Sequence, residues 1–332
     1  MTAPASRVTG NAPIIEVDRL SRRFKQFEAV SEVSFDVRPG ELFGFLGPNG
    51  AGKTTTINML TTLLTPSSGT ARVNGYDVVR ERSEVRRSIG LVFQQPTLDE
   101  YLSAEQNLRF HGYAYGVDAA LRERRMTELL EMVELDDRRS GSVRTFSGGM
   151  KRRLEIARGL LHHPSVLFLD EPTLGLDPQT RHRIWDYLHA LREQEGLTIF
   201  LTTHYMDEAE HCDRIAVIDH GRIAGLDTPD GLKHRLGGDL VILQADDNAA
   251  TAREVRETYG LPATVQDGRV SFHVPYGEEF LPGFVRRIEA PLTSIGVRRP
   301  TLEDVFLDLT GHEIRDSELD EHDLLLQQGG RR

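Results

Sequence analysis

The sequence predicts a larger α/β domain followed by a smaller α+β domain. A glycine-rich segment, residues 47–55, stands between an apolar run and a run with helical spacing. A second apolar run, residues 166–169, ends in two adjacent carboxylates, as a buried strand that reaches a polar site would. After residue 238 the composition shifts, and strands and helices are expected in the order βαββαβ. The chain has 332 residues, which is long enough for two domains.

Charge and cysteine content restrict the classes of function. Lys plus Arg is 40 and Asp plus Glu is 51, so the formal net charge is −11. A chain this acidic is a poor general binder of nucleic acid and does not adhere to anionic lipid through bulk charge. The single cysteine, Cys212, cannot form an internal disulfide, which favours a reducing cytosol. The first residues lack a signal-peptide pattern, and no apolar run approaches the roughly 18 residues of a membrane span. Transport across a membrane would therefore need another chain to form the passage.

The glycine-rich segment fits the template Gly, four residues, Gly-Lys-[Ser/Thr], with Gly47, Gly52, Lys53 and Thr54 at the fixed positions. An apolar strand is expected before it at residues 42–46, and a helix after it at residues 54–64. Backbone N–H groups at such a junction can face a chain of phosphates, because a glycine lets the ligand approach closely. Lys53 would place a positive charge between the outer phosphates, and Thr54 would offer its hydroxyl to Mg²⁺.

The two carboxylates after residues 166–169 add candidate residues for a metal and for a water molecule beside the phosphate loop. Asp170 at the end of a strand beside a phosphate loop can hold Mg²⁺, directly or through water. The next carboxylate, Glu171, can then polarise an attacking water.

The remaining elements follow from periodicity and turn signals. Between about residues 100 and 162, Leu, Arg and Glu dominate and apolar residues recur at helical spacing, which predicts a helical insertion. In the first domain, further strands are expected at residues 14–17, 33–37, 71–73, 88–93, 198–202, 214–218 and 222–224, and a helix at 178–194. In the second, strands are expected at 240–244, 263–266, 269–274 and 292–298, and helices at 249–259, 278–289 and 302–309. The βαββαβ order suggests a ferredoxin-like α+β unit.

Residues 146–150 read Phe-Ser-Gly-Gly-Met and lie between the phosphate loop and Asp170. This run is similar to the Leu-Ser-Gly-Gly-Gln signature of ABC ATPases, and the chain resembles the ATPase subunit of an ABC transporter over about residues 14–235. The resemblance implies a P-loop NTPase fold of the ABC ATPase type, in which a mixed sheet core carries an antiparallel β subdomain and a helical subdomain. Two departures are visible: Met150 replaces the usual glutamine, and the D-loop lacks the common Ser-Ala start.

The signature run points to a dimer. Ser147 would cap a helix N-terminus beside Gly148 and Gly149 and form a second anion site. Two phosphate-binding features at opposite faces of one chain suggest a head-to-tail homodimer. The signature of one subunit would then close on the ATP held by the other.

The resemblance assigns further residues one by one. Phe24, 23 residues before Gly47, resembles the aromatic residue that stacks on adenine, with Phe27 as the competing choice. Gln94 resembles the Q-loop glutamine, which contacts Mg²⁺ and the attacking water. Asp177 belongs to a segment that resembles the D-loop at the dimer interface. His204 follows a strand and resembles the switch histidine that bonds the γ-phosphate.

Together these assignments predict an ATPase with ATP and Mg²⁺ as cofactors. Glu171, His204 and Lys53 are the expected catalytic residues, and Thr54, Gln94 and Asp170 the expected metal ligands. The expected nucleotide contacts are Phe24, Gly47, Pro48, Asn49, Gly50, Ala51, Gly52, Lys53, Thr54, Thr55, Gln94, Ser147, Gly148, Gly149 and Asp177.

Residues 299–311 resemble the C-terminal signature of the daunorubicin/doxorubicin-resistance type of exporter ATPase, and residues 147–155 also resemble that group. The resemblance implies a peripheral protein at the cytoplasmic face of the cell membrane. It would power efflux of a drug-like or other hydrophobic compound through a separate integral membrane permease, with no nucleic acid as partner. Two alternatives stay open: a non-transport ABC-type ATPase that acts on ribosomes or DNA, and an importer subunit. The single phosphate loop argues against the first, and the C-terminal signature against the second.

The expected domain limits complete the prediction. They are a flexible N-terminal tail at residues 1–13, the nucleotide-binding domain at 14–235, the accessory domain at 238–311 and a flexible acidic tail at 312–332. Regulation, dimer support and permease contact are all open as roles for residues 238–298.

Overall fold

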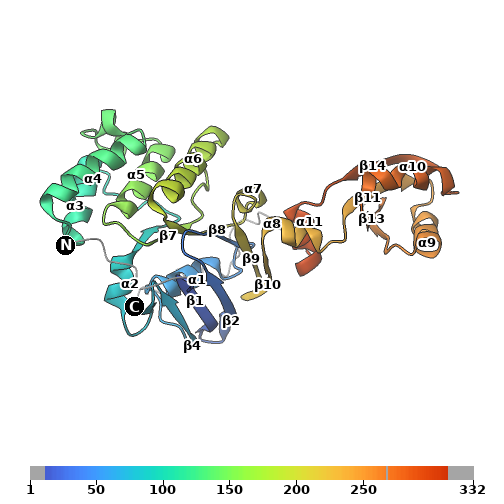
Figure 1. Ribbon diagram of the computed structural model, residues 1–332, viewed down its shortest axis with the longest axis horizontal. Coiled ribbons are helices and arrows are strands. Elements are labelled where there is room, and N and C mark those ends of the chain that lie inside the picture. The colour runs from blue at the N-terminus through green and yellow to red at the C-terminus, as the bar shows by residue number, and fades with distance from the viewer. Residues whose placement is uncertain (1–11, 267, 313–332) are drawn as a thin grey trace. The chain divides into compact units, whose positions relative to one another are not determined.

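The computed structural model describes residues 12–266 and 268–312 of the chain (Figure 1). The chain divides into two compact units, the first extending to Leu226 and the second beginning at Asp227. This division falls earlier than the expected domain limits of 235 and 238. Most of the two tails expected at residues 1–13 and 312–332 lies outside the described residues.

A six-stranded sheet forms the centre of the first unit, in the order β10-β9-β3-β8-β7-β6. Its strands are β3 (Leu42–Leu46), β6 (Ile89–Val92), β7 (Val166–Asp170), β8 (Thr198–Thr203), β9 (Arg214–Asp219) and β10 (Arg222–Asp227). Neighbours from β9 to β6 run parallel. Every residue of β3, β7 and β8 is buried, which explains why these strands are nearly continuous apolar runs.

A four-stranded antiparallel sheet, ordered β2-β1-β4-β5, packs against this core. Its strands are β1 (Ile15–Phe24), β2 (Phe27–Val37), β4 (Ser68–Val73) and β5 (Tyr76–Asp77). The expected strands at 14–17 and 33–37 were too short, because β1 and β2 form one long hairpin in which Phe24 pairs with Phe27. Register shifts along this pair interrupt the alternation of apolar and polar residues, so the sequence pattern reveals only part of each strand.

The two sheets share an aromatic core. The ring of Phe200 lies 5.4–6.0 Å from the rings of Phe35, Phe43, Phe45 and Phe168. Since these rings come from β2, β3, β7 and β8, the cluster joins both sheets and fixes the strand ends that carry the polar site.

Seven helices of the first unit fall within the described residues: α1 (Lys53–Leu60), α2 (Arg82–Ser88), α3 (Ala104–Ala114), α4 (Ala119–Met132), α5 (Gly148–Leu160), α6 (Pro178–Glu195) and α7 (Met206–Ala209). Two expected boundaries were wrong. Ser88 ends α2 and does not begin a strand, since its hydroxyl bonds the carbonyl of Val85 one turn earlier. The helix expected to reach residue 64 ends at Leu60, because Thr62 adopts a left-handed φ of 66°. The helices α3, α4 and α5 pack on one another and form the predicted insertion.

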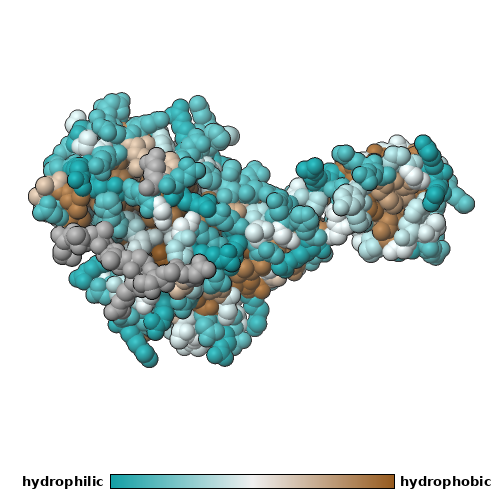
Figure 2. All heavy atoms as spheres, in the orientation of Figure 1, coloured by the Kyte–Doolittle hydropathy of each residue, from teal (hydrophilic) through white to brown (hydrophobic). Residues whose placement is uncertain are grey.

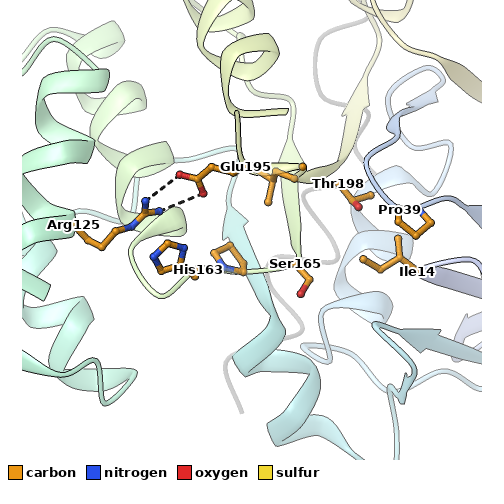
Figure 3. A pocket seen from close by; sticks show the side chains of 10 residues that line it. Ile14, Pro39, Arg125, His163, Ser165, Glu195 and Thr198 are labelled. Atoms are coloured by element: carbon orange, nitrogen blue, oxygen red, sulfur yellow. Dashed lines mark hydrogen bonds and ion pairs between the residues drawn. The ribbon is translucent and has the colours of Figure 1, made fainter. Parts of the chain in front are cut away.

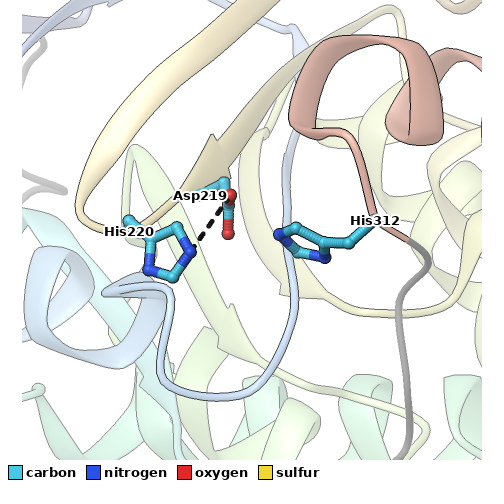
Figure 4. A group of neighbouring side chains, drawn as sticks. All are labelled: Asp219, His220 and His312. Carbon is cyan, nitrogen blue, oxygen red and sulfur yellow. Dashed lines mark ion pairs between the residues drawn. The ribbon is translucent and has the colours of Figure 1, made fainter.

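A tight turn joins β9 to β10. His220 and Gly221 both have positive φ, and His220 Nε2 lies 3.7 Å from Asp219 Oδ2 (Figure 4). Gly221 lies against the start of β2, where a Cβ would come within 2.8 Å of the Ala29 carbonyl oxygen. This turn therefore supports the strand that backs the glycine-rich loop.

The second unit has its own core. It contains α8 (Pro229–His234), β11 (Asp239–Ala245), α9 (Asn248–Tyr259), β12 (Thr264–Gln266), β13 (Arg269–Val274), α10 (Gly277–Arg287), β14 (Leu292–Arg298) and α11 (Leu302–Thr310). The antiparallel sheet is ordered β12-β13-β11-β14, and α9 and α10 bury Val255 and Phe284 against it. The βαββαβ order is as predicted, and the ferredoxin-like assignment stays our proposal. Figure 2 shows hydrophobic residues gathered on the visible face of this unit between hydrophilic margins.

None of the helices within residues 12–266 and 268–312 combines the length and the apolar character that crossing a bilayer requires.

The buried His162 predicts a pH dependence of stability. Its Nε2 lies 2.8 Å from the Ile89 carbonyl oxygen, and its ring stacks on Tyr115 at 3.9 Å. Burial lowers the pKa of His162 from 6.5 to about 4. As the pH falls, the imidazole of His162 is therefore protonated in the unfolded chain before it is protonated in the folded chain. The contribution of His162 to the free energy of unfolding is complete above pH 6.5 and is lost as the pH falls toward 4. We expect a loss of roughly 3 kcal/mol in the free energy of unfolding over that range from this group alone.

Urea unfolding at a series of pH values measures this. His162→Gln keeps a donor for the Ile89 carbonyl but cannot titrate, so its stability should fall less steeply between pH 6.5 and 4. His182→Gln is the control, because the His182 side chain is 80% exposed. Equal slopes for His162→Gln and the unmodified chain would contradict the assignment.

Candidate functional site

The glycine-rich loop leads from β3 into α1 at the carboxyl end of the parallel strands. A Cβ on Gly47 would lie 2.3 Å from the Ile218 carbonyl oxygen, and one on Gly52 would lie 2.6 Å from that of Ala29. Gly50 and Gly52 also have φ values of 78° and 104°, which side chains disfavour. Larger residues at Gly47 and Gly52 would therefore collide with backbone, whereas at Gly50 the restriction comes from the positive φ alone. Its last glycine is the N-cap of α1, so the first N–H groups of the helix stay available to an anion.

Lys53 lies beneath this loop. Its Nζ donates to the carbonyl oxygens of Gly47 at 2.9 Å and Pro48 at 3.0 Å, and lies 3.2 Å from Glu171 Oε1. The side chain is only 5% exposed. Burial lowers the pKa of Lys53, and the neighbouring Glu171 carboxylate opposes that effect. The amine is thus held where the phosphate-loop template places it.

Asp170 joins the loop to the end of β7. Its carboxylate accepts hydrogen bonds from Thr54 Oγ1 at 3.0 Å and from Thr202 Oγ1 at 2.5 Å. Burial raises the pKa of Asp170, while these two hydroxyls and Lys53 lower it. Such a carboxyl group favours a cation as partner, because a cation would relieve the cost of its burial.

Glu171 stands at the centre of the site. Its Oε1 lies 3.3 Å from His204 Nδ1 as well as beside Lys53, and its Oε2 accepts from Gln94 Nε2 at 3.1 Å. Burial raises the pKa of Glu171, but the hydrogen bond from His204 and the charge of Lys53 outweigh it, so the net shift is downward. The carboxylate is therefore ionised at neutral pH and able to orient a water molecule.

The side chains expected to hold Mg²⁺ line the same cavity. Thr54, Gln94 and Asp170 all line a cavity of about 450 Å³. They offer a hydroxyl, an amide oxygen and a carboxylate, which are the hard oxygen ligands that Mg²⁺ prefers. The donor set therefore fits a magnesium ion.

Four predicted residues lie on exposed helix starts. Ser147 is the N-cap of α5 and its Oγ accepts from Met150 N at 3.3 Å. Asp177 is the N-cap of α6 and accepts from Thr180 N at 3.0 Å. Gly149 faces Thr180, since a Cβ would come within 2.5 Å of that side chain, and Gly148 is exposed. The starts of α5 and α6 thus adjoin each other, with Ser147 and Asp177 facing solvent.

Phe24 ends β1 next to the turn of the β1–β2 hairpin. The Arg22 guanidinium carbon lies 4.6 Å from the centre of its ring. Phe24 is partly buried, whereas Phe27 is 43% exposed. The assignment of Phe24, with Phe27 as the competing choice, as the residue that stacks on adenine stays a prediction.

Sequence reasoning missed three buried polar residues at the site. Thr202 bonds both Asp170 Oδ1 and the backbone N–H of Glu171. Arg152 donates to the carbonyl of Glu171 at 3.0 Å. Burial raises the pKa of Glu208 to about 7, and Thr173 Oγ1 donates to it. Two local signals were present: Thr202 lies just before the Thr203-His204 pair, and Arg152 lies within the run 147–155 that resembles the exporter group.

A larger cavity, of about 580 Å³, lies at the opposite ends of the same strands. Ser165 and Thr198, at the starts of β7 and β8, line it, and so do Arg125 and Glu195 (Figure 3). The guanidinium of Arg125 meets both carboxylate oxygens of Glu195, at 3.0 and 3.3 Å. This cavity is remote from the phosphate loop, so size alone would have misplaced the site.

The chain is similar in sequence to known proteins along most of its length. The profile of the family described as ABC transporter matches residues 30–174. The chain is 42% identical over 307 residues to daunorubicin resistance ATP-binding protein DrrA3 of Streptomyces coeruleorubidus, covering 91% of this chain and 97% of that protein. It is 41% identical over 314 residues to Nod factor export ATP-binding protein I of Ralstonia nicotianae, covering 92% and 97% of the two chains.

A solved structure agrees. A dimeric ATP-binding cassette in a post-hydrolysis state, bound to ADP and Pi, matches with a TM-score of 0.59 at 28% identity, covering 64% of this chain and 98% of the cassette. The predicted fold class and the resemblance drawn from the signature run are thereby confirmed. The chain belongs to the family of ABC transporter ATP-binding proteins.

Proposed function

We propose that this ATPase is the motor subunit of an exporter that drives efflux of a drug-like or other hydrophobic compound through a separate membrane permease. The observation that carries the hydrolytic role is the convergence of Lys53, Gln94 and His204 on one carboxylate, Glu171. The relatives named for daunorubicin resistance and Nod factor export, each matched over most of its length, support export over the importer and ribosome or DNA alternatives.

Each of these residues has its own role in phosphoryl transfer. Lys53 and the N–H groups of the loop hold the outer phosphates, and His204 bonds the γ-phosphate. Thr54, Gln94 and Asp170 would hold Mg²⁺, which would supply positive charge to stabilise the transferred phosphate. Glu171 accepts a hydrogen bond from the attacking water and polarises it. This chemistry depends on positioning and on charge stabilisation more than on covalent catalysis.

The signature run completes the site only in a dimer. Ser147 and Asp177 are exposed, which leaves them free to meet a second copy. We propose a head-to-tail homodimer in which Ser147, Gly148 and Gly149 of one subunit contact the ATP held by the loop of the other. The dimeric state of the matched cassette supports this arrangement.

We further propose a peripheral position at the cytoplasmic face of the membrane, with residues 238–311 as an accessory domain. The exporter names of the relatives support this location.

Glu171→Gln tests the assignment of the water-polarising residue. The amide keeps the size of the side chain and its contact with Gln94 but cannot accept a proton, so hydrolysis should fall by about 100-fold or more while ATP binding persists. Steady-state phosphate release and ATP binding to the full-length chain measure the two effects. Hydrolysis at the parent rate would refute the role of Glu171.

A mixing experiment tests the shared site. Lys53→Met damages the loop and Ser147→Arg damages the signature, so either homodimer should be inactive. Equal mixing creates heterodimers with one intact site, and activity should recover to roughly one quarter of the parent value if pairing is random. The control is each variant mixed with itself. No recovery, although gel filtration shows that the chains exchange, would contradict the head-to-tail arrangement.

A further inference from the structure

Three side chains form a row along α5, the helix that begins at the signature run. Arg152, Glu155 and Arg158 are spaced three residues apart and therefore share one face of the helix. Arg152 is 5% exposed and Glu155 is fully buried. Charged side chains are buried only where hydrogen-bond or ion-pair partners offset the cost of removing them from water. The partners of these three side chains therefore indicate their role.

Arg152 binds two separate loops of the active site at once. Its Nη2 donates to the carbonyl oxygens of Asp170 and Glu171, both at 3.0 Å, and its Nε donates to that of Pro172 at 2.6 Å. Its Nη1 donates to the carbonyl oxygen of Phe93, the residue before Gln94. The planar guanidinium offers five donors in a fixed fork, which is why one side chain can serve carbonyls from both loops.

The other two members of the row hold the far side of the Gln94 loop. Glu155 Oε1 accepts from the N–H of Thr97 at 2.7 Å. Arg158 donates to the carbonyl oxygen of Thr97 at 2.9 Å and to its hydroxyl at 2.5 Å. Gln94 is thus attached to α5 on both sides, through Phe93 and Thr97.

The backbone of Glu171 explains why such support is needed. Its φ is 46°, a left-handed conformation that is strained for a residue with a side chain. Its N–H bonds Thr202 Oγ1 at 3.1 Å, and its carbonyl bonds Arg152. Contacts on both sides of the strained residue hold it in the conformation that directs its carboxylate toward Lys53, Gln94 and His204.

We propose that Arg152 is a positioning residue for ATP hydrolysis, which holds Glu171 and the Gln94 loop in register with the helix that carries the signature run. The inference rests on the roles proposed above for Glu171 and Gln94. Ser147 is the N-cap of α5, so a displacement of the signature run by the ATP of a second subunit would also move α5. The guanidinium of Arg152 would pass this movement to both loops. A purely structural role for Arg152 would instead reduce stability and leave the rate per folded molecule unchanged.

The test compares Arg152→Gln and Arg152→Lys with Arg153→Gln in the full-length chain. Arg153 is the matched control, since it lies on the same helix with the same charge but bonds the Val133 carbonyl, Glu134 and Tyr187. The measurements are kcat and KM for ATP per folded molecule, thermal unfolding, and amide hydrogen exchange of residues 93–97 and 170–173.

We expect Arg152→Gln to lower kcat by about 10- to 100-fold while KM for ATP changes by less than about twofold, since Lys53 and the loop amides are untouched. Exchange should rise in both segments together. Arg152→Lys should show an intermediate kcat, because an ammonium group has only three donors and no fork. Arg153→Gln should keep kcat within about twofold of the parent value.

A parent-like kcat for folded Arg152→Gln would overturn the inference, whatever its melting temperature, and so would an equal loss in Arg153→Gln. If Arg152→Gln does not fold, Arg152→Lys decides by the same criterion. Glu171→Gln, measured alongside, separates the two proposals. If Glu171→Gln hydrolyses ATP at the parent rate and Arg152→Gln is slow, only the role of Glu171 is refuted. If Glu171→Gln is inactive and Arg152→Gln hydrolyses ATP at the parent rate, only the role of Arg152 is refuted.

Discussion

The burial of two adjacent carboxylates at the end of β7 is the constraint on which the rest of the site depends. Asp170 and Glu171 are 4% and 7% exposed, in a setting where uncompensated negative charge is costly. Lys53, His204, Thr54 and several other donors are arranged around them. Lys53 and Thr54 come from the start of α1 and His204 follows β8, so the fold has to bring these segments together before the carboxylates can be buried.

The two carboxylates nevertheless have separate partners. Asp170 bonds the hydroxyls of Thr54 and Thr202, beside the cavity where a cation fits. Glu171, turned off the strand by its positive φ, meets Lys53, Gln94 and His204 instead. A single strained residue thus separates the carboxylate proposed to bind the metal from the neighbouring carboxylate proposed to polarise water. Strain of this kind persists because hydrogen bonds on both sides outweigh it.

The helix α5 connects the exposed and the buried parts of the first unit. Its first residues face solvent at Ser147, while Arg152 and Glu155, less than three turns further on, are buried against the active-site loops. A rigid helix transmits a displacement at one end to the other, because its backbone hydrogen bonds permit little internal change. In the proposed dimer, this one helix would join the contact with a second subunit to the site proposed for hydrolysis. The second unit, with its separate core around Phe272 and Phe284, has no assigned part in this chemistry.

The sequence by itself indicated the phosphate loop and the two carboxylates, because each lies at a junction of strand and polar loop that local patterns reveal. The glutamine and the histidine were assigned through the resemblance to ABC ATPases. The sequence also determined the apolar strands β3, β7 and β8, whose burial on both faces leaves a nearly continuous run. Only the tertiary structure decided that Arg152 and Thr202 bond the segment of the two carboxylates, that β1 extends to Phe24 and β2 begins at Phe27, and that Glu171 has a left-handed φ. Those features depend on which strands and helices become neighbours. Contacts between segments far apart in the chain leave no periodic trace in either segment, whereas the pattern of burial along a single element does.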